Sequence, residues 1–306
     1  MKPDGPIFIL GLQRGGTNQL LNILRSHPDT TWPHGEFHEV LRPSWANRNS
    51  VYDFARIAYR YLPVLSAQGD LINPRKQIRP AALDQRTRKW ISKGLAQATK
   101  KNGTEVSRYK AAIEAKGFFR NGPARSSRMV VKLVNYNVGL ARNLHQIYPN
   151  AMFIGIMRDA TGICESMMSR GAKPEKILGL YQSVAQTFLD LAGEDFPIML
   201  LRFEEIITDI VATSSRVFSF CGLDSDAISG LCLQDKARVF DKNGKVVGMQ
   251  KVDAYYDISI ASTHLRGDVN ASAHARLPEH LRLQIEASCG PLMQQLGYRS
   301  VGPVSD

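Results

Sequence analysis

An apolar run, a glycine-rich turn and an amphipathic helix follow one another without a gap in PIFILGLQRGGTNQLLNILRSH, residues 6–27. Residues 7–10 are all apolar and predict a buried parallel strand, and the helix is predicted by its apolar face. That face consists of Leu20, Leu21 and Leu24. A tight turn is permitted by the intervening glycines, Gly11, Gly15 and Gly16. Backbone N–H groups and the positive end of the helix would converge on one anion, which predicts a phosphate-binding turn.

This turn differs from the ATP-binding P-loop. That loop reads G-x-x-x-x-G-K-[ST], whereas here Thr17 follows Gly16 and the cation, Arg14, comes two positions earlier. The P-loop lysine reaches the terminal phosphates and the adjacent Ser or Thr holds magnesium, so neither function has its usual residue here. A plain connection between a strand and a helix is the structural alternative to a nucleotide site.

A second strand-to-helix transition occurs at AMFIGIMRDATGICESMMSR, residues 151–170. Arg158 closes the apolar strand, and Ser166 follows eight residues later in the predicted helix. This spacing places a guanidinium at the strand end and a hydroxyl in the early turns of the helix, so both can face one phosphate. An Arg-Asp pair in this position can also serve as a salt bridge or a helix cap.

Both segments resemble sulfotransferases. RGGTN, residues 14–18, is similar to the family's 5′-phosphosulfate loop, [KR]-[SG]-G-T-[TSNR], and residues 158–166 are similar to its R-[DN]-P-x5-S motif, with Ala160 in place of the proline. The likeness extends to three further segments, at residues 198–207, 214–223 and 283–298. It covers the first 40 or so residues and the chain from about Met129 onward.

The resemblance implies a donor, 3′-phosphoadenosine 5′-phosphosulfate (PAPS), a product, PAP, and no metal. The 5′-phosphate would be bound by residues of the first turn, Arg14, Gly15, Gly16, Thr17 and Asn18. Arg158 and Ser166 would bind the 3′-phosphate, and Arg266 in HLRGDVN would belong to a basic loop that closes over it. An exposed loop arginine is the alternative for Arg266. Asn18 and Gln19 stand where the family often has Thr-Trp, so the side chain that packs on adenine is left open.

Catalytic roles follow from the same likeness. Arg14 would stabilise the bridging oxygen as PAP departs, because an arginine is permanently charged and bidentate. Lys132 in MVVKLV matches a lysine beside the sulfuryl group, although a strand-end lysine can also extend to water. An alcohol acceptor needs a base, and PHGEFHEVL, residues 33–41, supplies three candidates. Glu36 is the leading one, His38 and Glu39 are the alternatives, and a helix cap is the non-catalytic interpretation of Glu36.

Basic charge is concentrated in one part of the chain. The net charge is +11, and residues 70–132 contain 16 Lys and Arg against 4 Asp and Glu. A solvated helical face, an anionic acceptor, an acidic partner and a nucleic acid are the possible readings. Nucleic acid is disfavoured because the segment lacks interleaved aromatic residues and a nucleic-acid-binding motif. The four cysteines have no metal-binding or disulfide-framework spacing, which favours reduced, buried thiols.

The pattern predicts an α/β fold of the P-loop-kinase type, in three layers, with a parallel sheet of 4–5 strands between helices. With 306 residues and 43% apolar content, residues 1–306 are expected to form one domain. The expected strands are residues 7–10, 129–134, 152–157 and 198–203, with a short fifth at 30–32. Residues 40–128 are expected to be a helical insertion over the carboxyl edge of the sheet, where ligands bind and where it would shape the acceptor site.

The leading function is therefore transfer of a sulfuryl group from PAPS by in-line displacement to a hydroxyl, in preference to an amine, of a small molecule or glycan. An anionic acceptor is favoured by the basic segment. The alternatives are an ATP-dependent kinase of P-loop architecture and a non-catalytic protein that binds nucleotides or polyanions. The sequence predicts a cytoplasmic protein without nucleic-acid or membrane partners, since it has no signal-peptide pattern and no long apolar run. The sequence does not specify the acceptor or the oligomeric state.

Overall fold

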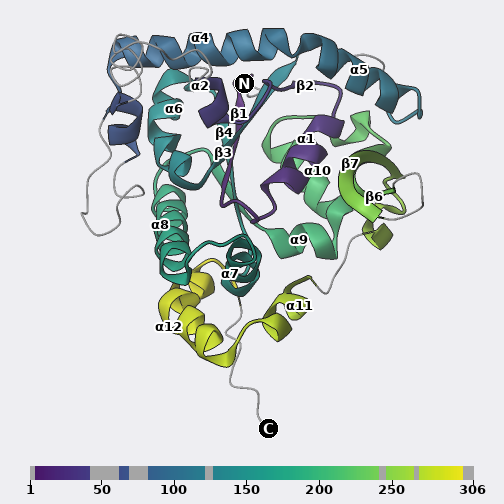
Figure 1. The fold of residues 1–306 in the computed structure, drawn as a ribbon. Coiled ribbons are helices and arrows are strands. Elements are labelled where there is room, and N and C mark those ends of the chain that lie inside the picture. The colour runs from purple at the N-terminus through teal and green to yellow at the C-terminus, as the bar shows by residue number, and fades with distance from the viewer. Residues whose placement is uncertain are drawn as a thin grey trace.

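A parallel sheet of five strands lies at the centre of the computed structural model, which describes residues 4–41, 62–68, 82–120, 127–240, 246–264 and 269–298 (Figure 1). The strand order is β2-β3-β1-β4-β5. The strands are β1 (Ile7–Gly11), β2 (Thr30–Thr31), β3 (Arg128–Val134), β4 (Met152–Met157) and β5 (Ile198–Arg202). All five match predicted strands, and the expected α/β fold is confirmed. The last strand is one residue shorter than predicted, because Phe203 begins a helix.

Register aligns the ends of the three central strands. Gly11 at the end of β1 lies opposite Val134 of β3 and Ile156 of β4. Every residue of β1 is buried, which fits a central strand covered on both faces. The chain segments that leave β1, β3 and β4 therefore start side by side at the carboxyl edge of the sheet.

Helices cover both faces of the sheet, because successive apolar side chains of each strand point to opposite faces and both faces must be buried. Phe8, Leu10 and Phe153 face one core cluster, while Ile7, Ile9 and Ile154 face the other. Figure 1 shows α6 (Ala141–Ile147), α8 (Pro174–Ala192) and α12 (Glu279–Gln295) on one side. The opposite side holds α1 (Thr17–Ser26), α9 (Phe203–Thr208) and α10 (Ile210–Phe220). At the carboxyl edge lie α7 (Ala160–Met168) and α11 (Val269–Arg276).

An antiparallel hairpin that the sequence reading did not anticipate follows α10. It pairs β6 (Gly230–Phe240) with β7 (Val246–Asp257) and forms a separate two-stranded sheet. The hairpin is fastened to α1, because the N–H of Cys232 donates to Ser26 Oγ at 2.9 Å. Leu231 and Leu233 are buried in the same core cluster as the inner face of α1. The hairpin thus becomes a wall beside the first helix.

The described helices of residues 40–128 lie elsewhere than expected. Besides α2 (Phe37–Leu41), they are residues 62–67, α4 (Gln85–Lys101) and α5 (Gly103–Glu114). Figure 1 shows α4 and α5 at the end of the sheet where β1 begins, opposite the expected carboxyl edge. Thr99 accordingly bonds to Met129 near the start of β3. Residues 42–61 and 69–81 of the expected insertion lie outside the described residues, so a role of the segment in shaping the acceptor site stays a prediction.

A buried lysine joins α5 to the end of α1. Lys110 Nζ donates to the carbonyl of Arg25 at 2.7 Å, to the carbonyl of His27, and to Thr30 Oγ1 at 3.0 Å. The ammonium also lies 5.3 Å from the centre of the Trp32 ring. Helix C-termini leave carbonyls without intrahelical partners, and this lysine satisfies them. Burial lowers the pKa of Lys110 to about 7.

That pKa predicts a pH-dependent contribution to stability. The unfolded lysine keeps its proton up to about pH 10.5, whereas the folded one loses it near pH 7. Between these values the unfolded state binds more protons, so stability should rise with pH. We expect the free energy of unfolding of the wild type, minus that of Lys110→Met, to increase over this window by at most about 1.4 kcal/mol per pH unit. Urea titrations at several pH values measure it, and a difference independent of pH would contradict the assignment.

Candidate active site

The turn between β1 and α1 has two residues in left-handed backbone conformations. Arg14 has a φ of 69° and Gly16 a φ of 94°. Gly16 is also the N-cap of α1, and no side chain caps the helix there. A first helical turn without a side-chain cap presents N–H groups to an anion, as the glycine pattern predicted.

Gly16 is also required because an aromatic ring lies too close to this position for a side chain. A Cβ built on Gly16 would lie 2.3 Å from Cδ2 of Phe203, the first residue of α9. The guanidinium carbon of Arg158 lies 5.3 Å from the centre of the same ring. The turn after β1, the end of β4 and the start of α9 therefore meet around one aromatic side chain.

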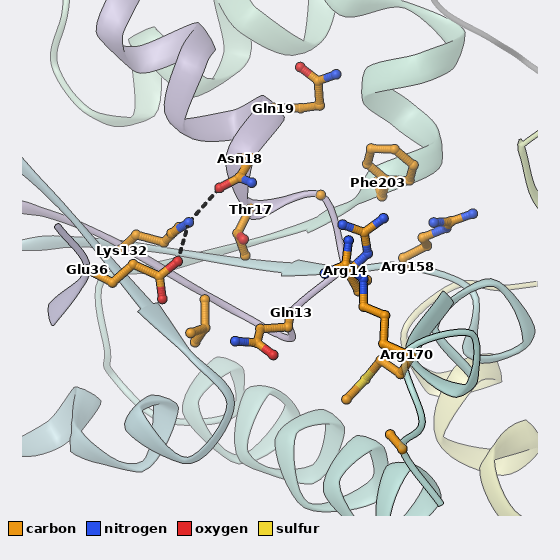
Figure 2. Close-up of a pocket in the computed structure, with 14 residues that line it drawn as sticks. Gln13, Arg14, Thr17, Asn18, Gln19, Glu36, Lys132, Arg158, Arg170 and Phe203 are labelled. Atoms are coloured by element: carbon orange, nitrogen blue, oxygen red, sulfur yellow. Dashed lines mark hydrogen bonds and ion pairs between the residues drawn. The ribbon is translucent and has the colours of Figure 1, made fainter. Parts of the chain in front are cut away.

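These segments surround a cavity of about 580 Å³ at the carboxyl edge of the sheet (Figure 2). Its walls come from the turn after β1, the start of α1 and β3. Further wall residues follow the ends of β4, α7 and β5. The predicted residues that line it are Arg14, Gly16, Thr17, Asn18, Glu36, Lys132 and Arg158. The lining residues that the sequence reading did not assign are Gln13, Gln19, Val134, Met167, Arg170, Ala172 and Phe203.

Three guanidinium groups gather at one end of the cavity. Figure 2 shows Arg14, Arg158 and Arg170 there. Burial lowers the pKa of Arg14, and the charge of Arg170 lowers it further. Burial also lowers the pKa of Arg158, whose exposed fraction is 8%. Arginines keep their charge at neutral pH, so this end of the cavity favours an anion with several negative charges.

A hydrogen bond links the two predicted phosphate-binding segments. Arg14 Nε donates to Ser166 Oγ at 2.8 Å. Ser166 does not line the cavity itself but is hydrogen-bonded to Arg14, which does. Gly15 stabilises the first turn, because its N–H donates to the carbonyl of Leu12 at 3.1 Å. The two strand ends, far apart in sequence, meet at one place. Arg266 lies outside the described residues.

Polar contacts from three distant segments hold Arg158 in position. Its Nε donates to Asn270 Oδ1 of α11 at 2.9 Å, and Asn270 also donates to Glu204. Glu204 accepts the N–H of Asp159 at 3.0 Å and the hydroxyl of Tyr298 at 3.0 Å. Asp159 in turn caps α7 through the N–H of Thr161 and that of Gly162. No local pattern marks these partners, so the sequence reading did not find them.

A lysine–glutamate pair forms the other end of the cavity. Lys132 Nζ lies 2.7 Å from Glu36 Oε1 and also donates to Asn18 Oδ1. Figure 2 shows this arrangement opposite the arginines. The side chain of Lys132 is only 10% exposed, so it does not extend freely to water. The pair brings together a cation, a carboxylate and the start of α1.

The structure separates the three candidate bases. Glu36 lines the cavity, and its Oε2 lies 3.6 Å from Nδ1 of His38. Glu39 is exposed and accepts the N–H of Glu36 at 2.7 Å, so Glu39 holds the start of α2. The carboxylate of Glu36 forms its ion pair with Lys132 at the cavity wall. Of the three candidates, Glu36 is therefore the one that borders the cavity, with His38 as its neighbour.

Neither a metal centre nor a membrane-spanning helix is found among the residues that the structure describes. Among these residues, no three His, Cys, Asp or Glu side chains lie close enough together to hold a metal ion. In the described part of the chain, every helix is too short or too polar to span a lipid bilayer.

The sheet order and the cationic cavity define an α/β protein with an anion-suited cavity at the edge where such sheets bind ligands. The chain belongs to the sulfotransferase family, whose model matches residues 6–227. Among solved structures it is similar to the sulfotransferase domain of the Synechococcus PCC 7002 olefin synthase, with 16% identity over 98% of each chain and a TM-score of 0.47. It is also similar to a sulfotransferase from Alicyclobacillus acidocaldarius, with 16% identity over 95% of this chain and 94% of that one, and a TM-score of 0.44. A comparison with curated proteins found no match.

The contact between Gly16 and Phe203 predicts a specific loss of stability. Gly16→Ala adds a methyl group that collides with the ring and strains the positive φ, so we expect a loss of about 2–4 kcal/mol in the free energy of unfolding. Gly117→Ala is the matched control, because Gly117 has a φ of 73° and no atom within 4 Å of the added Cβ. It should lose only about 1 kcal/mol. Urea unfolding compares the two, and equal losses would refute the steric contribution.

Proposed function

We propose that this protein transfers the sulfuryl group of PAPS to a hydroxyl group of a small molecule or glycan by in-line displacement. One observation carries the proposal. Arg14 and Arg158, which follow two different strands, line the same cavity as the Lys132–Glu36 pair. Family membership supports the reaction class, and the cavity supplies what the reaction needs, namely cations for phosphates at one end and a carboxylate for a hydroxyl proton at the other.

The cationic end suits the two phosphorylated ends of PAPS. Arg14 and the first N–H groups of α1 would hold the 5′-phosphate, together with Thr17 and Asn18. Arg158 and Ser166 would hold the 3′-phosphate. The Ser166 hydroxyl accepts from Arg14 and still has its own O–H to donate to a phosphate oxygen. Phe203 is the aromatic residue that we assign to packing against adenine, because its ring borders the turn and the cavity.

The other end suits activation of the acceptor. When bound, PAPS supplies the sulfuryl group, with PAP as the leaving portion. Glu36 would accept the proton of the attacking hydroxyl. Lys132 and Arg14 would neutralise negative charge that develops on the transferring and bridging oxygens. All of these side chains border one cavity, so positioning and electrostatics can act without a metal ion.

Nucleotide preference provides the first test. We expect PAP to bind in the absence of magnesium at least about tenfold more tightly than ADP, because Arg158 and Ser166 would contact the additional 3′-phosphate. Isothermal titration calorimetry with both nucleotides measures this difference. Equal affinity, or binding that requires magnesium, would instead favour an ATP-dependent kinase.

Replacement of the base provides the second test. Glu36→Gln should lower kcat by about 10²–10⁴-fold while PAP affinity stays within about threefold, because the amide cannot accept the hydroxyl proton. Glu39→Gln is the control, since Gln retains an oxygen that can accept the Glu36 N–H.

Transfer can be followed with radiolabelled PAPS and a panel of hydroxyl compounds, with products detected by mass spectrometry. Near-normal turnover in Glu36→Gln would remove Glu36 from the role. No transfer to any acceptor, with salt-sensitive polyanion binding, would favour the non-catalytic alternative. The acceptor class, the cytoplasmic location and the absence of nucleic-acid partners stay predictions.

A further inference from the structure

A second cavity, of about 200 Å³, adjoins the Lys132–Glu36 pair. It shares Asn18, Glu36 and Lys132 with the first cavity and continues from them along α1. The arginines that suit a nucleotide lie beyond the other side of the same pair (Figure 2). The lysine–glutamate pair therefore stands between two spaces, one suited to a phosphorylated donor and one without an assigned occupant.

One face of α1 forms the length of this cavity. Asn18, Asn22 and Arg25 line it, and their spacing of four and three residues places them on one side of the helix. The rise along an α-helix puts Arg25 about 10 Å beyond Asn18. Leu21 of α1 adds an apolar side chain. The remaining wall comes from the loop after β2, from β3 and from the hairpin, and includes Trp32, Val130 and the amide of Gln234.

A cation with unused hydrogen-bonding capacity lies at the far end. The guanidinium carbon of Arg25 lies 4.6 Å from the centre of the Trp32 ring. Arg25 Nε and Trp32 Nε1 are both buried, and neither has a hydrogen-bond partner within the described ranges. Buried donors without partners are costly, and native proteins usually satisfy them. The Arg25 side chain nevertheless lines the cavity, so its guanidinium is the group at this end that can bind an acceptor oxygen supplied from outside the chain.

The charges around Arg25 do not neutralise it. Burial lowers its pKa, yet an arginine stays protonated at neutral pH. Glu105 and Asp253 are near enough to raise that pKa, but both are exposed, and no described hydrogen bond joins either of them to Arg25. The neighbouring Lys110, whose pKa is lowered by burial and by the charge of Arg25, supplies no compensating negative charge. An anionic ligand group is the complement of this end of the cavity.

We propose that the second cavity is the acceptor subsite and that Arg25 binds an anionic group of the acceptor, a carboxylate or a phosphate monoester. The inference rests on the proposed function, because it places the reacting hydroxyl at Glu36 and Lys132. The acceptor class is then a hydroxylated acid whose hydroxyl and anionic group are separated by a short, largely apolar linker of about 10 Å or less. Specificity for an anionic acceptor comes from Arg25, not from the basic surface of α4.

Binding to the PAP complex tests this inference without a known acceptor. The probes are straight-chain ω-hydroxy carboxylic acids of increasing length, their methyl esters, and the matching ω-hydroxyalkyl phosphates. Calorimetry should show that the acid or the phosphate binds at least about tenfold more tightly than the ester of the same length, because a charged hydrogen bond to Arg25 is lost in the ester. Affinity should peak at one chain length, since the hydroxyl must reach Glu36 while the anion reaches Arg25.

Variants assign the preference to Arg25. Arg25→Gln should reduce the ratio of acid to ester affinity by about tenfold, and Arg25→Lys should retain part of it. Gln234→Glu places a negative charge in the same cavity, so it should also lower the ratio and provides a test should Arg25→Gln fail to fold. Arg142→Gln, which removes a surface pair with Glu194, is the control and should keep the wild-type ratio.

The outcomes distinguish a failure of the anionic subsite from a failure of the proposed function. If the wild-type protein does not bind PAP, the proposed function itself is refuted. If PAP binds and acids and esters bind equally, or none of the probes binds, the anionic subsite is refuted while the proposed function stands. An unchanged ratio in Arg25→Gln or in Gln234→Glu would likewise refute the assignment. A preference for the phosphate over the carboxylate would identify which of the two anions the subsite fits better.

Discussion

The parallel pairing of β1 with β3 and β4 is the constraint on which the site depends. Its register ends all three strands at one level, so Arg14, Arg158 and the β3 lysine, Lys132, are carried to one edge. Burial on both faces fixes this register, because a slip of one residue would turn apolar side chains into the wrong layer. The hydrogen bond between Arg14 and Ser166 then joins two turns that the sheet has already brought together.

Local sequence patterns were sufficient for the sheet and for half of the residues that line the main cavity. Strand, turn and helix signals at residues 6–27 and 151–170 each depend on neighbouring residues, and the fold places both as predicted. Partners that depend on long-range packing were not readable. Asn270 reaches Arg158 from beyond the hairpin, and Phe203 follows its strand as an ordinary apolar residue whose contact with Gly16 only the fold reveals. The position of α4 differs from the expectation because helical spacing gives no information about which end of a sheet a helix covers (Figure 1).

The arginines of the main cavity are positioned partly by neutral groups. Arg14 donates through Nε to a hydroxyl, and Arg158 donates through Nε to an amide. These contacts fix the orientation of each side chain without cancelling its charge, and burial strengthens its interaction with an anion. Glu204 accepts from the Asp159 backbone and from Asn270, so the acidic group nearest the network helps to hold it together. Binding strength is thus built into the support of the arginines as well as into the arginines themselves.

The β6–β7 hairpin has a consequence for how such an enzyme can diversify. Its residues follow the 6–227 range that the family model matches, yet Gln234 borders the second cavity. The groups that we assign to the donor come before the hairpin on the sheet edge and on α7. On the proposed assignment of the two cavities, changes in hairpin sequence or length can therefore alter the acceptor subsite opposite α1 and leave the residues assigned to the nucleotide unchanged.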